Sequence, residues 1–236
     1  MTVRTATAFM HPGLVFAALS LVLLPLVWTL SLWAYASAML PAAMFLVIAG
    51  TAGAGLIRHY AHPTLGACNI ITLLRAAFVC VLAGAILTPP TTPMAHWSIC
   101  AAAVLALSLD GMDGWLARRT GHVSAFGARF DMETDALLGA VLAVIAWQSG
   151  VAAIVLLLGF MRYLFVGAAW IWPWLSAPLP DRLRRKSVCV VQIAALIFLL
   201  VPDVPQALST LIVYSATGVL AWSFGADIWL LWQRRA

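Results

Sequence analysis

The sequence predicts an all-α integral membrane protein, a polytopic bundle of about eight transmembrane helices. The chain has 236 residues, of which 64% are hydrophobic and 9% are charged, whereas about 25% of the residues in a soluble domain are charged. About eight apolar stretches approach the roughly 20 residues that a helix needs to cross a bilayer. The basic residues gather in the connections on one side of these stretches, as they do in polytopic membrane proteins.

Four helices are predicted in the first half of the chain. The first follows Arg4 and has an apolar run of more than about 20 residues, too long for the core of a signal peptide, so we interpret it as an uncleaved transmembrane helix. A signal peptide ending in the small residues 34–38 is the alternative. Pro41 marks the break before the second helix, and the proline- and threonine-rich run 89–93 separates the third from the fourth. The helices are predicted at residues 13–36, 39–57, 69–88 and 97–118.

Four more helices are predicted in the second half, each followed or preceded by turn-forming residues. The fifth ends at the sequence Gln148-Ser149-Gly150, the sixth at the proline-rich segment 173–180, and the seventh at the two prolines within 202–205. Glycine and proline at such points favour turns over continued helix. The helices are predicted at residues 129–148, 151–172, 187–202 and 207–232.

The basic residues predict the orientation of the chain. With eight helices and both termini in the cytoplasm, every basic residue outside the helices lies on the cytoplasmic side, as the positive-inside rule requires. We therefore predict a multi-pass protein of an inner or plasma membrane, and no binding of nucleic acid, although the net charge is +5. Arg75 and Arg162 lie within predicted helices. The other basic residues are Arg4, Arg58, Arg118, Arg119, Arg129, Arg182, Arg184, Arg185, Lys186, Arg234 and Arg235.

Acidic residues concentrate where the fourth helix ends and the fifth begins. Asp110 and Asp113 are three residues apart, and Asp131 and Asp135 are four apart, so each pair shares one helix face. Glu133 points about 200° away from Asp131 and is left out of the cluster. An antiparallel hairpin therefore brings four carboxylates together in the cytoplasmic half of the membrane. A charge at the centre of a membrane helix costs about 2.5–3.5 kcal/mol, so an acidic cluster in a membrane segment requires a compensating partner.

Four carboxylates so close together cannot all stay ionised unless cations balance them. Oxygen ligands in this number are typical of sites for Mg²⁺, Mn²⁺ or Ca²⁺. Two divalent ions would balance four negative charges, and paired metal ions are a common device for displacement at phosphorus. The charges alone thus predict a metal site with two ions.

The spacing within this region is more specific than its charge. The segment from Asp110 to Asp135 reads D-x2-D-G-x2-A-R-x8-G-x3-D-x3-D. It resembles the signature of the CDP-alcohol phosphatidyltransferase family at every fixed position. Upstream, the weaker pattern Asn69-x2-Thr72-x2-Arg75 is similar to the first core helix of that family.

The resemblance implies a transfer reaction of phospholipid synthesis, in which the hydroxyl of an alcohol attacks the β-phosphorus of a CDP-linked substrate and CMP leaves. It implies that two ions, Mg²⁺ or Mn²⁺, bind to the aspartates and that Asp135 is also the general base. The implied metal ligands are Asp110, Asp113, Asp131 and Asp135. The implied contacts with the CDP moiety are Asn69, Thr72, Gly114, Arg118 and Ser124.

The resemblance and the predicted membrane location also suggest the substrates. We expect CDP-diacylglycerol as the donor because the site lies in the membrane and faces the cytoplasm. Arg162, Arg184 and Lys186 resemble the acceptor-phosphate pocket of members that use glycerol 3-phosphate or inositol phosphate. Alternatively, residues 182–186 bind lipid headgroups, Arg162 pairs with an aspartate, and the acceptor is neutral or a lipid, such as serine, choline or phosphatidylglycerol.

On this interpretation the chain has two parts. Residues 61–236 form a six-helix catalytic core like that of the family, and residues 1–60 add two N-terminal transmembrane helices that many members lack. A homodimer is the family-level expectation. A cation or proton transporter that uses the intramembrane aspartates is an alternative from another class, although transporters typically spread such residues over several helices of an internal repeat.

Overall fold

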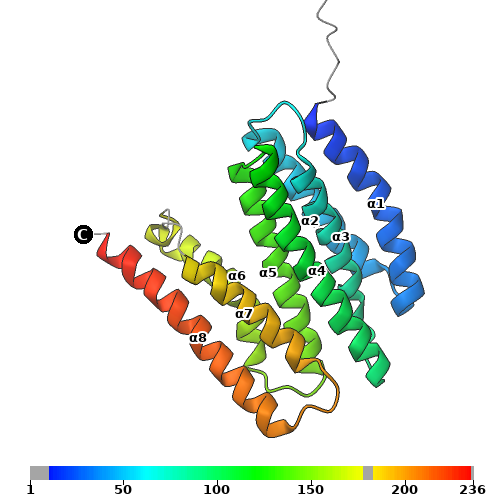
Figure 1. Ribbon diagram of the computed structural model, residues 1–236, viewed down its shortest axis with the longest axis vertical. Coiled ribbons are helices and arrows are strands. Elements are labelled where there is room, and N and C mark those ends of the chain that lie inside the picture. The colour runs from blue at the N-terminus through cyan, green and yellow to red at the C-terminus, as the bar shows by residue number, and fades with distance from the viewer. Residues whose placement is uncertain (1–10, 178–182, 235–236) are drawn as a thin grey trace, which may run out of the picture. The chain divides into compact units, whose positions relative to one another are not determined.

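The computed structural model describes residues 11–177 and 183–234, with the side chains of 183–186 excluded. Within these residues the chain forms eight α-helices and two short 3₁₀ helices, without strands (Figure 1). The predicted all-α fold class is therefore confirmed. The elements are α1 Pro12–Tyr35, α2 Met39–His59, α3 Ala67–Leu82, η1 Ala83–Ile86, α4 Pro93–Thr120, α5 Ala125–Gln148, α6 Val155–Ile171, η2 Pro173–Ser176, α7 Leu183–Leu199 and α8 Gln206–Gln233.

Five helical stretches are long and apolar enough to cross a membrane: α1, α2, α3 with η1, α4 and α8. Helix α5 has 24 residues, but Arg129, Asp131, Glu133 and Asp135 make its first half strongly charged. Helix α6 and the described apolar part of α7 are shorter than the predicted spans. These lengths and compositions agree with a polytopic helical membrane protein.

Helices α4 and α5 begin earlier than the apolar pattern predicts, and a capping residue precedes each of them. Helix α4 begins at Pro93, and the Thr92 hydroxyl accepts a hydrogen bond from the Ala95 N–H at 3.2 Å. Proline suits a first helical turn, whose N–H groups have no partner within the helix. Helix α5 begins at Ala125, where the Ser124 hydroxyl accepts from the Gly127 N–H at 3.0 Å.

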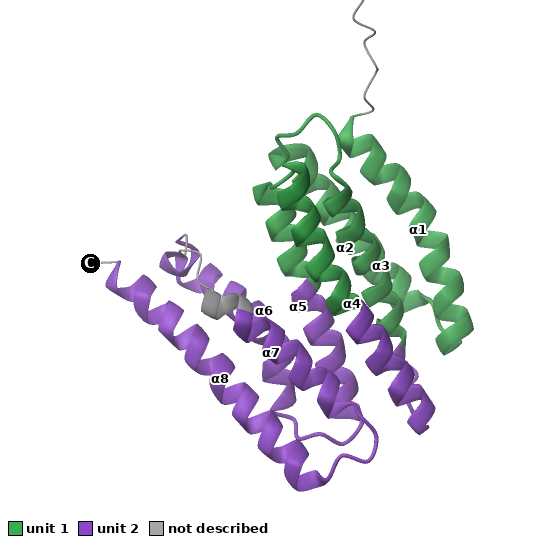
Figure 2. Ribbon diagram, in the orientation of Figure 1, with its two compact units in different colours: residues 1–84, 106–134 green, residues 85–105, 135–236 purple. Residues whose placement is uncertain are grey.

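The chain divides into two compact units, residues 1–84 with 106–134 and residues 85–105 with 135–236 (Figure 2). In the first unit, α1 packs against α2 and α3, and α2 also packs against α3. Aromatic rings fill its interior: Phe16 meets Phe130 edge to face, and Phe130 stacks on Phe126. The first unit thus joins the two N-terminal helices to the end of α4 and the start of α5.

In the second unit, α8 packs against α6, α7 and η2. Gly159 of α6 lies against α5, where an added Cβ would come within 2.5 Å of the Ala143 Cβ and 2.7 Å of the Gly139 carbonyl oxygen. Small residues of this kind let two helix backbones approach closely in a membrane. Gly150, with a φ of 95°, turns the chain after α5, as the predicted break requires.

Candidate active site

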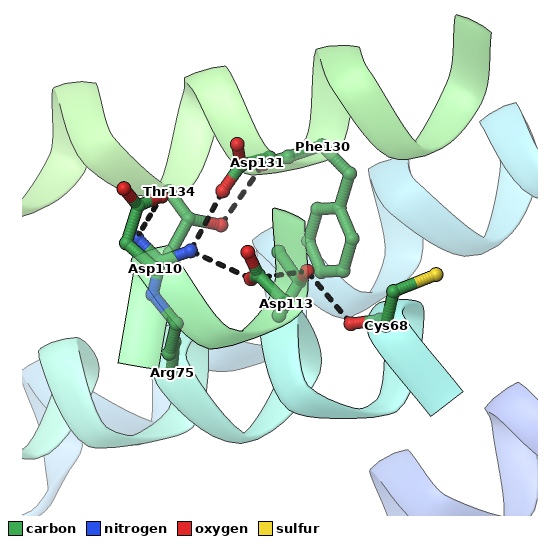
Figure 3. A network of polar contacts seen from close by, with 8 residues as sticks. Cys68, Arg75, Asp110, Asp113, Phe130, Asp131 and Thr134 are labelled. Atoms are coloured by element: carbon green, nitrogen blue, oxygen red, sulfur yellow. Dashed lines mark hydrogen bonds and ion pairs between the residues drawn. The ribbon is translucent and has the colours of Figure 1, made fainter. Parts of the chain in front are cut away.

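Three aspartates converge where α4 ends and α5 begins. One carboxylate oxygen of each of Asp110, Asp113 and Asp131 lies within 4.8 Å of the other two (Figure 3). Asp110 and Asp113 share a face of α4 because they are one helical turn apart, and Asp131 faces them from α5. Asp113 is buried, whereas Asp110 and Asp131 are half-buried. The group therefore combines a shielded carboxylate with two that are open on one side.

Arg75 of α3 lies at the centre of this group. Its Nη2 is 3.1 Å from Asp110 Oδ1, and its Nη1 is 2.8 Å from Asp113 Oδ2 and 2.6 Å from Asp131 Oδ1. The side chain is only 1% exposed, and Figure 3 shows it reaching between the three carboxylates. A planar guanidinium with donors on both sides suits such bridging better than an ammonium. Three carboxylates and one guanidinium leave a net charge of −2.

Arg75 was not among the predicted site residues, although two features of the sequence indicate it. Arg75 is an ionisable residue within a predicted membrane helix, where a charge requires an anionic partner. It also lies three residues after Thr72, on the face of the helix that carries the weaker upstream pattern.

The hydroxyl of Thr72 on α3 contacts the Asp113 carboxylate. Its Oγ1 lies 3.0 Å from Asp113 Oδ2 and 3.0 Å from the Cys68 carbonyl oxygen, one turn earlier in the helix. The hydroxyl has a single proton, which it shares between these acceptors. Thr72 was expected at the CDP moiety, and the structure places its hydroxyl on a carboxylate of the cluster.

Asp135 lies one turn after Asp131 on α5, at the start of the second unit. Among the described residues, the converging group contains Asp110, Asp113 and Asp131, while Asp135 and Glu133 are outside it. Asp135 is half-buried. The structure therefore brings three of the four expected aspartates together.

Gly114 and Arg118 lie one turn apart near the end of α4. A Cβ added to Gly114 would meet only the Arg118 side chain, with Nη1 at 3.5 Å. The absence of a side chain at Gly114 is thus not required by packing against another helix of the described chain. The neighbouring Arg119 has another contact: its guanidinium lies 4.9 Å from the centre of the Trp115 ring.

Asn69 and Ser124 meet at Gly127. An added Cβ on Gly127 would come within 2.9 Å of Asn69 Oδ1 and 3.1 Å of Ser124 Oγ. Only glycine therefore allows α5 to approach α3 this closely without displacing the amide. Asn69 is only 1% exposed, so its amide is buried against Gly127.

The expected acceptor residues belong to the second unit. Arg162 lies in the middle of α6 and is half-buried. The side chains of Arg184 and Lys186 lie outside the described residues, as does Arg182.

A family model described as CDP-alcohol phosphatidyltransferase matches residues 65–226, which is more than half of the chain. The chain belongs to the CDP-alcohol phosphatidyltransferase family. It is therefore a transferase of substituted phosphate groups that moves a phosphatidyl group from a CDP-alcohol in phospholipid synthesis. No solved structure matches the chain. Membership of this family favours a transferase over a transporter.

The chemistry of the three carboxylates fits a divalent metal ion. The family uses divalent metals, and Asp110, Asp113 and Asp131 offer hard oxygen ligands close enough together to share one. With Arg75 included, their net charge of −2 matches one such ion. The transferase thus has a candidate metal site within the segment that matches the family model.

Proposed function

We propose that the transferase moves the phosphatidyl group of CDP-diacylglycerol to a phosphate-bearing alcohol, such as glycerol 3-phosphate or inositol phosphate, and releases CMP. The observation that carries this proposal is the convergence of Asp110, Asp113 and Asp131 in the α4–α5 hairpin, which lies within the segment that the family model matches. Arg162 in the middle of α6 supports an anionic acceptor, because a guanidinium can bind a phosphate through two parallel hydrogen bonds.

We propose Mg²⁺ or Mn²⁺ as the metal, with two ions held by the three converging aspartates and Asp135. With Asp135 the acidic residues and Arg75 carry a net charge of −3, so two divalent ions leave a small positive charge that attracts a diphosphate. When bound, such ions neutralise the charge that develops on the phosphate oxygens and on the departing CMP.

The proposed reaction forms one bond to the β-phosphorus of the donor and breaks another. The acceptor oxygen bonds to the β-phosphorus, the bond from that phosphorus to the bridging oxygen breaks, and CMP leaves with the bridging oxygen. Asp135 takes the proton of the acceptor hydroxyl as general base. Arg118 binds a phosphate of the donor through its forked guanidinium, and Gly114, one turn away, leaves room for that phosphate.

The nucleotide end of the site lies at the start of α5 in this proposal. Ser124 contacts the CDP moiety, and so does Asn69, whose amide lies against Gly127. Thr72 acts indirectly, because its hydroxyl orients Asp113.

We also propose how the chain is divided and how it is oriented in the membrane. Residues 61–236 form the catalytic core, residues 1–60 add two helices to it, and the site faces the cytoplasm. The start of the family match at residue 65 supports this division, and the distribution of basic residues supports the orientation. A homodimer is kept as the family-level expectation.

An acceptor screen tests the proposed function. The purified transferase is supplied with CDP-diacylglycerol and Mg²⁺ or Mn²⁺, and CMP release is measured with glycerol 3-phosphate, inositol phosphate, serine, choline or phosphatidylglycerol. We expect release with a phosphate-bearing acceptor and its loss when the metal is chelated. Preference for serine, choline or phosphatidylglycerol would refute the phosphate-bearing acceptor, and release with none of the five would refute the donor as well.

A further inference from the structure

We propose that Tyr60 is a positioning residue for the nucleotide end of the site, and that it acts by fixing the direction of the Asn69 amide. Tyr60 lies directly after α2 and before residue 65, where the match to the family model begins. The inference rests on the proposed function, because Asn69 and Ser124 are the residues assigned there to the CDP moiety.

The Tyr60 hydroxyl uses its full hydrogen-bonding capacity. It donates to the Thr64 carbonyl oxygen at 3.1 Å and accepts from the Gly66 N–H at 2.9 Å and from Asn69 Nδ2 at 3.2 Å. A phenol has one proton to donate and two positions at which to accept. All three are occupied, so the hydroxyl fixes both the α2–α3 connection and the first turn of α3.

This arrangement determines which way the Asn69 amide points. Because the only proton of the Tyr60 hydroxyl is directed at Thr64, the hydroxyl can only accept from Asn69, and the NH₂ group must face it. The carbonyl Oδ1 of Asn69 then faces Gly127, where an added Cβ would lie 2.9 Å away. Without the hydroxyl, the amide is free to flip and to present its NH₂ group to Gly127 and the CDP moiety.

The ring of Tyr60 connects the same region to α5. It meets the Phe126 ring edge to face at 5.8 Å, and the His62 ring at 5.3 Å. Phe126 lies in the first turn of α5, two residues after Ser124. The aromatic contacts therefore place the Tyr60 hydroxyl with respect to both residues assigned to the nucleotide.

The connection that Tyr60 stabilises also lies against the α4–α5 connection. His62 Nε2 is 3.2 Å from the Val123 carbonyl oxygen, and Thr64 Oγ1 is 3.4 Å from His122 Nε2. At Gly66 the two connections are so close that an added Cβ would lie 2.8 Å from the His122 Cβ. Residues 60–66, most of which precede the family match, thus set the position of the loop between Arg118 and Ser124.

The variant Tyr60→Phe removes the hydroxyl and keeps the ring contacts. We expect its KM for CDP-diacylglycerol to rise about tenfold, the effect of losing roughly one hydrogen bond to a buried group, while kcat and the KM for the acceptor change less than about twofold. The matched control is Tyr214→Phe, since Tyr214 is 55% exposed on α8. His62→Ala, which removes the bond to Val123, should raise the same KM by a smaller factor and serves if Tyr60→Phe does not fold.

A double-mutant comparison separates positioning from a general structural role. If Tyr60 acts through Asn69, the combination Tyr60→Phe with Asn69→Ala has the same KM for CDP-diacylglycerol as Asn69→Ala alone. Multiplied effects, or a lower Tm without a change in this KM, would overturn the inference. A wild-type chain that releases no CMP would instead refute the proposed function, and this inference with it.

Discussion

Replacing Arg75 removes the guanidinium that contacts three carboxylates in the described structure, and the effect on stability follows from its burial and contacts. Arg75 is 1% exposed and contacts Asp110, Asp113 and Asp131 at 2.6–3.1 Å. Removing one partner of a buried ion pair costs about 3–5 kcal/mol. Because Asp110 and Asp131 are half-buried, we expect about 3 kcal/mol for Arg75→Met in the absence of metal. For a chain of this size that lowers Tm by about 6–12 °C.

The same change should make the protein more responsive to metal. Without Arg75 the net charge of the three carboxylates falls from −2 to −3, so a divalent ion binds the folded protein more tightly and stabilises it more. Tm is measured at one fixed heating rate in detergent, with chelator and with increasing Mg²⁺. We expect Mg²⁺ to raise the Tm of Arg75→Met by more than that of the wild type.

Arg119→Met is the matched control for Arg75→Met. Arg119 is exposed and lies on the Trp115 ring, and exposed substitutions usually change stability by no more than about 0.5 kcal/mol. The reasoning would be refuted if Arg75→Met without metal were as stable as Arg119→Met, or if Mg²⁺ stabilised the two variants equally.

Three further substitutions test other contacts of the site by CMP release. Thr72→Val removes the hydroxyl on Asp113 and should lower kcat about tenfold, as loss of one hydrogen bond to a charged group does; unchanged kcat would contradict the orienting role. Gly127→Ala places a Cβ 2.9 Å from Asn69 Oδ1, so the KM for CDP-diacylglycerol should rise severalfold while the protein still folds. An unchanged KM would contradict the assignment of Asn69 to the CDP moiety. Asp135→Asn should lower kcat by about 10²–10⁴, the usual contribution of a general base, and full activity would exclude that role.

The helices could be predicted from the sequence because length and hydrophobicity determine which segments cross a membrane. Every predicted helix has a counterpart in the structure, and the turn at Gly150 lies where the sequence placed it. The starts of α4 and α5 were predicted too late, because Thr92 and Ser124 cap helical turns that lie outside the apolar pattern.

The site was predictable where its residues lie on neighbouring turns and in one hairpin. The spacing of Asp110, Asp113 and Asp131 was sufficient to expect them together. Arg75 and Tyr60 were missed for a different reason. Arg75 contacts residues that follow it by 38 and 56 positions, and Tyr60 acts through a hydroxyl whose partners are mostly backbone groups. Such contacts depend on which helices pack together, and no local pattern specifies this.

The most direct test of the central claim is CMP release from CDP-diacylglycerol by Asp131→Asn and by Glu133→Gln. Both substitutions remove one negative charge from the first half of α5, but only Asp131 belongs to the converging carboxylates. With Mg²⁺ and the preferred acceptor, Asp131→Asn should lose at least about 100-fold in kcat/KM, or about 2.7 kcal/mol of transition-state stabilisation, and Glu133→Gln should retain wild-type activity. Equal activities of the two variants would contradict the assignment of the reaction to this site.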